Sequence, residues 1–279
     1  MLVEIAIGDA YGAGFEYAAP GPGRPNDLAR YYPHPRHGIA PGCYTDDTQM
    51  SLAVAETLLE HGTAATPLQF IEKFVLAFKR DPREGYASRF WAFLKSVRDA
   101  ADFAARISPA SAKSGAAMRA CPIGVLPAIE DVLLVAERQA QTTHDTAGGI
   151  HSAQATALAT HYFLYGLGKR ADLPHFLQAH VAGIWSPHRG EVGAEGVVAI
   201  RAAVTAVIAE DSLSGILRRS VDFGGDVDTV AAIALGIACG SVEHARDLPP
   251  VLYETLEDGP YGMTYLRDLD ACLLALAGR

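Results

Sequence analysis

A long succession of helical segments constrains the fold of this chain more than any other feature. From about residue 49 onward, apolar residues recur at the spacing of one helix face, and alternating patterns typical of strands are nearly absent. We therefore expect an all-α fold, with residues 1–279 forming a single multi-helix domain. The predicted helices span residues 49–61, 67–80, 86–107, 130–139, 147–165, 173–184, 191–209, 212–221, 229–243 and 263–276.

Residues 1–45 are expected to be irregular, because glycine and proline are frequent throughout this part of the chain. Gly8, Gly12 and Gly14 lie within seven residues and suit either a turn or close helix packing. The segment does not match the G-x-G-x-x-G pattern, and no strand precedes it, which disfavours a dinucleotide-binding fold.

The charge balance of the chain limits its partners. Lys and Arg number 23 against 32 Asp and Glu, which gives a formal net charge of −9. A surface of this sign repels nucleic-acid backbones, so DNA and RNA are not expected as partners. Because neither a signal peptide, a membrane span nor a paired-cysteine motif is recognisable, we expect a cytoplasmic protein with reduced thiols. Separately, we expect a monomer.

Two short segments combine paired carboxylates with threonine hydroxyls immediately before apolar helices. All of these side chains offer oxygen atoms, the donors that Mg²⁺ and Mn²⁺ prefer. If packing brought the two helix starts together, the segments could hold a pair of cations. The residues concerned are Thr45, Asp46 and Asp47 in the first segment, and Asp226, Asp228 and Thr229 in the second.

Ordinary helix capping is the alternative interpretation of these clusters. Asp and Thr are common at helix starts because they accept hydrogen bonds from free N–H groups. A cap needs one acceptor, however, whereas adjacent acids recur at two helix starts here. Gly224 and Gly225 add a close backbone approach that capping does not require.

A third segment, Ser114-Gly115-Ala-Ala-Met118, and His144 farther along the chain are candidates for ligand contact. The first is either a simple turn or a set of backbone N–H groups that holds phosphate at a helix start. His144 lies in a predicted loop before a helix. Neither H-E-x-x-H nor G-x-S-x-G occurs, so a zinc protease and a Ser-His-Asp hydrolase are not supported.

Taken together, five ordered segments between about residues 3 and 245 resemble the ADP-ribosylglycohydrolase family. The segments are GDAYGAGFE, YTDDTQMSLA, SGAAMRACPIG, TTHD and GGDVDTVAAIALGIACG. Val227 departs from the family's usual threonine, Ser114 from its usual asparagine, and Leu235 and Cys239 from its usual small residues. These departures affect the expected substrate preference more than the expected catalysis.

The resemblance implies an all-α fold with a binuclear Mg²⁺ or Mn²⁺ centre and assigns roles to individual residues. Asp228 would bridge two ions, and Glu16 would serve as a ligand, a base or a gate. Asp47 or Glu16 would guide proton transfer. Ser114, Gly115 and Met118 would hold the diphosphate and distal ribose, and His144 would contact ADP-ribose. The implied metal ligands are Thr45, Asp46, Asp47, Asp226, Asp228 and Thr229.

We therefore expect a metal-dependent hydrolase that releases ADP-ribose from a modified protein side chain such as arginine or serine. Two other functions remain open from the sequence. One is a non-catalytic ADP-ribose-binding protein, and the other is a phosphohydrolase with two metal ions, since paired metals also serve that chemistry.

Overall fold

The structure, a computed structural model, describes residues 1–278. Throughout those residues the regular structure is helical, and strand-like pairing is limited to isolated bridges. The all-α prediction is therefore confirmed. The α-helices are α1 (Leu2–Ala13), α2 (Asp46–His61), α3 (Pro67–Arg80), α4 (Ser88–Ser96), α5 (Ala100–Arg106), α6 (Ile129–Gln141), α7 (Ala147–Leu164), α8 (Leu173–His180), α9 (Gly196–Ala209), α10 (Leu213–Asp222), α11 (Val227–Ala238), α12 (Pro250–Glu254) and α13 (Met263–Leu276), and short 3₁₀ helices include Ser114–Ala116 and Cys121–Val125.

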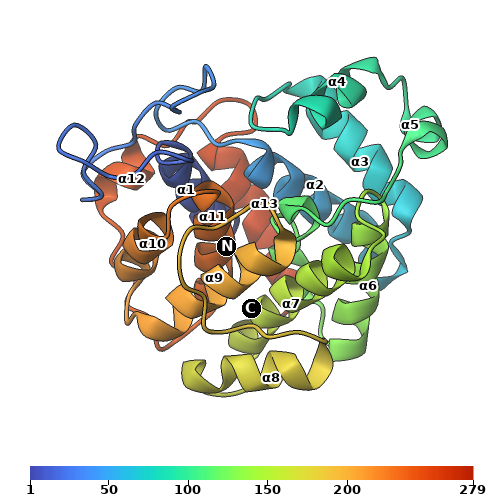
Figure 1. The fold of residues 1–279 in the computed structure, drawn as a ribbon. Helices are drawn as coiled ribbons and strands as arrows, with labels where there is room; N and C mark the ends of the chain where they lie inside the picture. Colours follow the sequence, from blue (N-terminus) through green and yellow to red (C-terminus); the bar gives the residue numbers. More distant parts are fainter. Residues whose placement is uncertain (279) are drawn as a thin grey trace.

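Helix α1 corrects the expectation that residues 1–45 are irregular. All twelve of its residues are buried, and it packs against α11 in the interior of the molecule (Figure 1). A Cβ atom on Gly8 would lie 2.4 Å from the carbonyl oxygen of Ala231, and one on Gly12 would lie 2.4 Å from the Cα atom of Asp228. The glycines weaken the helix locally, but they allow the two backbones to approach closely.

The predicted helix at residues 67–80 agrees with α3, where Pro67 occupies the first turn after Thr66. The segment predicted as one helix at 86–107 instead forms α4 and α5. The backbone is extended at Val97, and Asp99 then caps α5 by accepting a hydrogen bond from the N–H of Asp102. The five-residue helix α12 was missed.

The remaining helices surround the central pair. Helix α11 packs against α1, α7, α9 and α10, while α2 lies between α3 and α13 (Figure 1). This packing brings the N-termini of α2 and α11, which carry the two acidic segments, to the same region. Among the described residues, no helix is sufficiently long and apolar to cross a membrane.

Candidate active site

The start of α2 is capped by groups other than its own acids. Oγ1 of Thr45 accepts a hydrogen bond from the N–H of Asp47, although at 3.4 Å this bond is long. Asp9, which lies on α1 and is fully buried, accepts hydrogen bonds from the N–H groups of Thr45 and Thr48 and from the Thr48 hydroxyl at 2.6 Å. The carboxylates of Asp46 and Asp47 are therefore not needed as caps.

The start of α11 shows the same division of roles. Asp226 occupies the N-cap position, yet its side chain makes no capping hydrogen bond. Its Oδ2 atom instead accepts a hydrogen bond from Oγ of Ser114 at 3.3 Å. One buried carboxylate oxygen in each segment, Oδ1 of Asp47 and Oδ1 of Asp228, has no hydrogen-bond partner among the described residues. Capping therefore does not account for the two acidic clusters.

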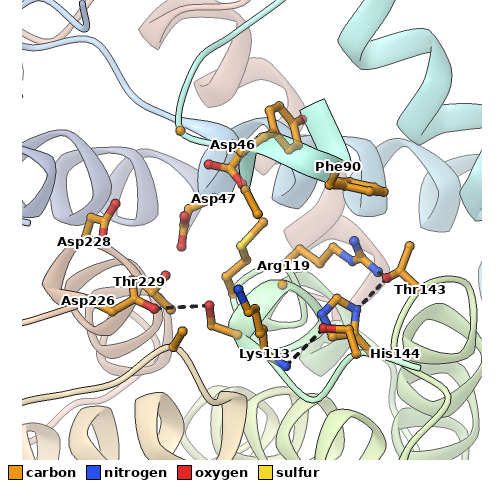
Figure 2. Close-up of a pocket in the computed structure, with 18 of the residues that line it drawn as sticks. Asp46, Asp47, Phe90, Lys113, Arg119, Thr143, His144, Asp226, Asp228 and Thr229 are labelled. Atoms are coloured by element: carbon orange, nitrogen blue, oxygen red, sulfur yellow. Dashed lines mark hydrogen bonds between the residues drawn. The ribbon is translucent and has the colours of Figure 1, made fainter. Parts of the chain in front are cut away.

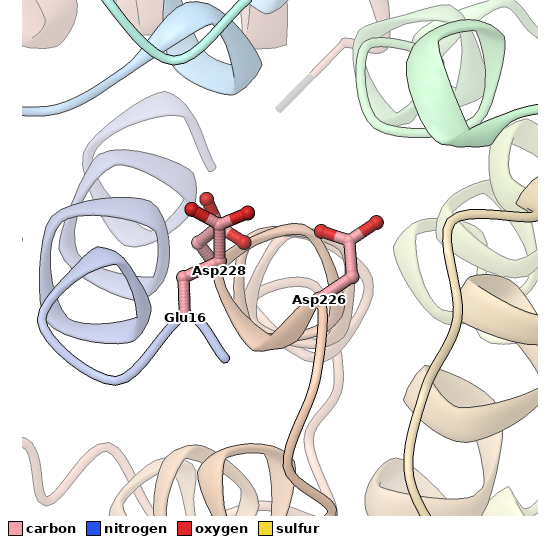
Figure 3. A group of neighbouring side chains, drawn as sticks. All are labelled: Glu16, Asp226 and Asp228. Carbon is pink, nitrogen blue, oxygen red and sulfur yellow. The ribbon is translucent and has the colours of Figure 1, made fainter. Parts of the chain in front are cut away.

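Three carboxylates from two separate segments of the chain lie close together near the start of α11. Glu16, Asp226 and Asp228 each present an oxygen, and these oxygens lie within 4.8 Å of one another (Figure 3). Burial and neighbouring carboxylates, including Glu16, raise the pKa of Asp226 to about 6. The same causes raise the pKa values of Asp46, Asp47 and Asp228 well above the ordinary value. Unneutralised carboxylates at such distances repel one another.

This donor set fits divalent cations. It consists of carboxylate oxygens of the half-buried Glu16 and the buried Asp226 and Asp228, and Oδ1 of Asp228 has no hydrogen-bond partner among the described residues. Hard cations such as Mg²⁺, Mn²⁺ and Ca²⁺ prefer such oxygen donors. The ligand set does not distinguish Mg²⁺ from Mn²⁺, because both accept carboxylate and hydroxyl oxygens.

The acids lie at one end of a cavity of about 360 Å³ (Figure 2). Every residue predicted to be functional lines this cavity except Thr45, which is buried at the cap of α2. The other end of the cavity contains Arg119 and His144, and Lys113 lies between the two ends. The cavity therefore has an acidic end suited to cations and a basic end suited to an anionic ligand. The predicted residues that line it are Glu16, Asp46, Asp47, Ser114, Gly115, Met118, His144, Asp226, Asp228 and Thr229.

The phosphate-binding helix start expected after Ser114 is smaller than predicted. Residues Ser114–Ala116 form a three-residue 3₁₀ helix, and the N–H of Ser114 already donates to the carbonyl of Ala194 at 2.8 Å. A helix this short has little macrodipole. The N–H groups of Gly115 and Ala116 are in its first turn, where they are not used within the helix. Gly115 lines the cavity and its N–H group remains available to an anion there, whereas Ala116 is buried and does not line the cavity.

His144 occupies a restricted position at the basic end. Burial, followed by the charge of Arg119, lowers the pKa of His144 to about 3, so the ring is neutral at pH 7. Its Nδ1 atom lies 2.6 Å from Oγ1 of Thr143. A Cβ atom on Gly115 would lie 2.8 Å from Cε1 of the imidazole, so this glycine allows the ring to pack against the backbone.

Several residues near the acids were not recognised from the sequence. Nε2 of His34 is hydrogen-bonded to Oε2 of Glu16, while its Nδ1 accepts from the N–H groups of Arg36 and His37 at 3.0 and 3.1 Å. Nε2 of His34 is therefore the donor to Glu16, and the pair fixes the position of that carboxylate. His34 follows Glu16 by 18 residues within a proline-rich loop, and no local signal connects the two.

Gly85 was also not recognised from the sequence, because its partner, Asp46, is distant along the chain. It has a φ of +109°, and a Cβ atom at this position would lie 2.4 Å from Oδ1 of Asp46. The glycine therefore allows the loop before α4 to pass directly over this carboxylate.

Comparisons with known proteins agree with this geometry. The family model described as ADP-ribosylglycohydrolase matches residues 1–279. This chain belongs to the ADP-ribosylglycohydrolase family. It is 28% identical over 289 residues to ADP-ribosyl-dinitrogen reductase glycohydrolase of Rhodospirillum rubrum, with 98% of this chain and 94% of that protein covered.

Two further matches extend the comparison. An ADP-ribosylarginine hydrolase of Serratia proteamaculans is 26% identical over 267 residues, covering 89% of this chain and 72% of that protein. A solved structure titled ADP-ribosylglycohydrolase-related protein complex aligns with a TM-score of 0.72 at 26% identity and covers 99% of this chain and 95% of the other. The resemblance noted in the sequence and the expectation of a hydrolytic enzyme are therefore confirmed at the level of the family.

Proposed function

We propose that this ADP-ribosylglycohydrolase uses two divalent cations, Mg²⁺ or Mn²⁺, to cleave the glycosidic bond between ADP-ribose and a protein side chain. The observation that carries the proposal is a buried group of carboxylates, some without hydrogen-bond partners, at one end of a cavity whose other end is basic. Such a cavity accommodates cations beside the bond to be cleaved and anionic phosphates away from it.

The residues proposed to hold the cations are the two segments at the starts of α2 and α11. When bound, the cations supply Lewis-acid chemistry and activate water for attack on the anomeric carbon. Within the chain, Asp47 or Glu16 accepts the proton of the attacking water, and His34 orients Glu16. The proposed metal ligands are Thr45, Asp46, Asp47, Asp226, Asp228 and Thr229.

The nucleotide part of the substrate is proposed to occupy the other end of the cavity. The N–H group of Gly115 donates to the diphosphate, Ser114 and Met118 line the distal ribose, and His144 contacts ADP-ribose. The reacting sugar passes through a transition state resembling an oxocarbenium ion, as in other glycoside cleavages. The nearby carboxylates stabilise its positive charge.

The modified side chain is proposed to be arginine or serine, and arginine is the first to test. The name of the Serratia relative refers to ADP-ribosylarginine. Because the formal net charge of the chain is −9, its surface repels nucleic-acid backbones, and we do not propose DNA or RNA as substrate. We further propose that residues 1–279 act as one domain, as a monomer, in the cytoplasm.

The test incubates the protein with ADP-ribosyl-arginine and ADP-ribosyl-serine peptides in Mg²⁺, Mn²⁺ or chelator and measures released ADP-ribose by mass spectrometry. Metal-dependent release from one peptide supports the proposal and identifies the linkage. Asp47→Asn and Asp228→Asn should each reduce the rate by at least about 100-fold. Full activity of both variants in chelator would contradict the scheme.

Two outcomes would favour other functions. Binding of ADP-ribose without release from any peptide would indicate a reader of the modification. Release of inorganic phosphate in place of ADP-ribose would indicate a phosphohydrolase.

A further inference from the structure

Arg119 is a buried cation that forms no ion pair with a carboxylate among residues 1–278. Its side chain lines the basic end of the cavity, yet only 1% of the residue is exposed, and its guanidinium lies 4.2 Å from the ring centroid of Phe74. Its hydrogen bonds go to neutral acceptors, the closest being Oε1 of Gln139 at 2.6 Å and Oγ1 of Thr143 at 2.8 Å. Burying a charge without an opposite charge is unfavourable, so this placement calls for a functional explanation.

A chain of hydrogen bonds connects Arg119 to His144 through Thr143. Nη2 of Arg119 lies 2.8 Å from Oγ1 of Thr143, which lies 2.6 Å from Nδ1 of His144 (Figure 2). A guanidinium can only donate hydrogen bonds, so Thr143 accepts from Arg119. The single hydroxyl proton of Thr143 then has Nδ1 of His144 as its acceptor among the described residues. This direction leaves Nδ1 unprotonated and puts the ring proton on Nε2.

The opposite edge of the imidazole lies beside Gly115. Both residues line the cavity, and a Cβ atom on Gly115 would lie 2.8 Å from Cε1 and 3.1 Å from Nε2 of His144. The ring is thus held on one side by Thr143 and on the other by a glycine with no side chain to displace it. An Nε2–H group in this position is a hydrogen-bond donor at a fixed place beside Gly115.

We propose that Arg119 is a positioning residue that acts through Thr143 to hold His144 as the Nε2–H tautomer. The cation stays out of direct contact with the acids and orients one hydroxyl, and that hydroxyl sets the proton position on the histidine. The neutral ring then donates a hydrogen bond to an oxygen of the bound nucleotide. The identity of that ligand as ADP-ribose rests on the proposed function, whereas the tautomer does not.

Thr142 offers a matched control. Its Oγ1 also accepts from Nη2 of Arg119, at 3.2 Å, and it is buried to a similar degree as Thr143. Its hydroxyl proton, however, is donated to the carbonyl of Gln139 at 2.6 Å. Thr142→Val and Thr143→Val therefore remove the same kind of group beside the same guanidinium, but only the second interrupts the connection to His144.

The first experiment measures the ¹⁵N chemical shifts of the His144 ring by NMR in the ligand-free protein, assigned with His144→Gln. We expect an unprotonated, hydrogen-bonded Nδ1 in the wild type and in Thr142→Val. In Thr143→Val the Nδ1 resonance should move away from the hydrogen-bonded position, and Thr143→Ser should restore it. A protonated Nδ1 in the wild type, or no change in Thr143→Val, would overturn the proposal.

The second experiment measures the Kd of ADP-ribose by calorimetry in the presence of Mg²⁺. Thr143→Val should weaken binding about tenfold, and Thr142→Val by less than about twofold, since only the first loses an oriented donor. Arg119→Lys keeps the charge but not the planar geometry, and it should resemble Thr143→Val. Equal losses of ADP-ribose affinity in Thr142→Val and Thr143→Val would show that Arg119 has only a structural role.

These two readouts separate this inference from the proposed function. If the wild type binds no ADP-ribose, the proposed ligand is wrong, while the NMR result still decides whether the Thr143 hydroxyl sets the tautomer. If the protein binds ADP-ribose and releases it from peptides, but the His144 tautomer is the same in Thr143→Val as in the wild type, the proposed function is supported and the proposed role of Arg119 is wrong.

Discussion

Asp9 shows how one buried residue determines what its neighbours can do. Its carboxylate accepts hydrogen bonds from two N–H groups and one hydroxyl at the start of α2. Because Asp9 and Thr45 satisfy this helix start, Asp46 and Asp47 are free to face the cavity. The role of Asp9 could not be predicted from the sequence, because it depends on the packing of α1 against α2, and no local sequence pattern indicates that contact.

The bond between Thr48 and Asp9 can be tested by removing one hydroxyl. Thr48→Val should lower the free energy of unfolding by about 1–2 kcal/mol, because a buried carboxylate loses its shortest hydrogen bond. The control is Thr57→Val in the same helix, where the buried hydroxyl donates only to the helix carbonyl of Ala53. Urea denaturation should show the larger loss for Thr48→Val, and equal losses would contradict the role of Asp9.

Gly85 gives a second prediction at this scale. Gly85→Ala combines a positive φ with a collision at Oδ1 of Asp46, so it should lower both stability and metal affinity. Gly190→Ala is the matched control, because Gly190 has a φ of +86° with no atom near the added Cβ. The control should lose only about 1 kcal/mol of stability. Calorimetric titration with Mn²⁺ separates the two, and an unchanged Mn²⁺ affinity in Gly85→Ala would contradict the prediction.

At the scale of elements, α3 and α1 differ in how far their sequences reveal them. Thr66 and Pro67 mark the start of α3 by local chemistry alone, and its boundaries were predicted correctly. In α1, Gly8 and Gly12 appear as helix breakers, although they serve contact with a helix more than 200 residues away. Local propensity therefore gave the wrong expectation, because tertiary packing decided the structure.

The contact between α1 and α11 predicts different outcomes for two neighbouring glycines. Gly12→Ala would collide with the Cα atom of Asp228, a proposed metal ligand, whereas Gly8→Ala would collide with the backbone at Ala231, one turn farther from the site. Both should destabilise the protein by about 1–3 kcal/mol through overpacking. Only Gly12→Ala should also weaken Mn²⁺ binding by tenfold or more, as measured by calorimetric titration. Equal effects on affinity would show that the contact does not position Asp228.

At the scale of the whole molecule, the sequence predicted the candidate site better than its surroundings. The acids and Ser114 lie in short segments whose residue types and order match a known family, so they could be named in advance. His34, Gly85 and Arg119 act through partners distant in sequence, and nothing in their local composition reports those partners. Whether the named residues perform their assigned roles stays a prediction.

The acidic end of the cavity makes stability depend on metal and pH together. The pKa of Asp226 is raised to about 6, above the unfolded value of about 4. The folded metal-free protein therefore binds more protons than the unfolded chain, and the contribution of this group to stability is lost as pH rises through that range. Near pH 7.5 cations should raise Tm by about 5 °C at roughly a hundred times their Kd, and less at pH 5.

Thermal denaturation with Mg²⁺, Mn²⁺ or EDTA at the two pH values measures this effect. Asp47→Asn should reduce the rise in Tm at pH 7.5, while a surface variant such as Asp27→Asn should not. A rise in Tm that is the same at pH 5 and pH 7.5 would contradict the account.

The pairing of α1 with α11 also has a consequence during synthesis on the ribosome. The cavity draws its acids from distant parts of the sequence, with Glu16 near the beginning and Asp228 near the end. A nascent chain that stops before α11 leaves an apolar helix, α1, without its partner, and this surface is one that chaperones recognise. A chain that lacks α11 therefore lacks both the packing partner of α1 and two of the proposed metal ligands, Asp228 and Thr229.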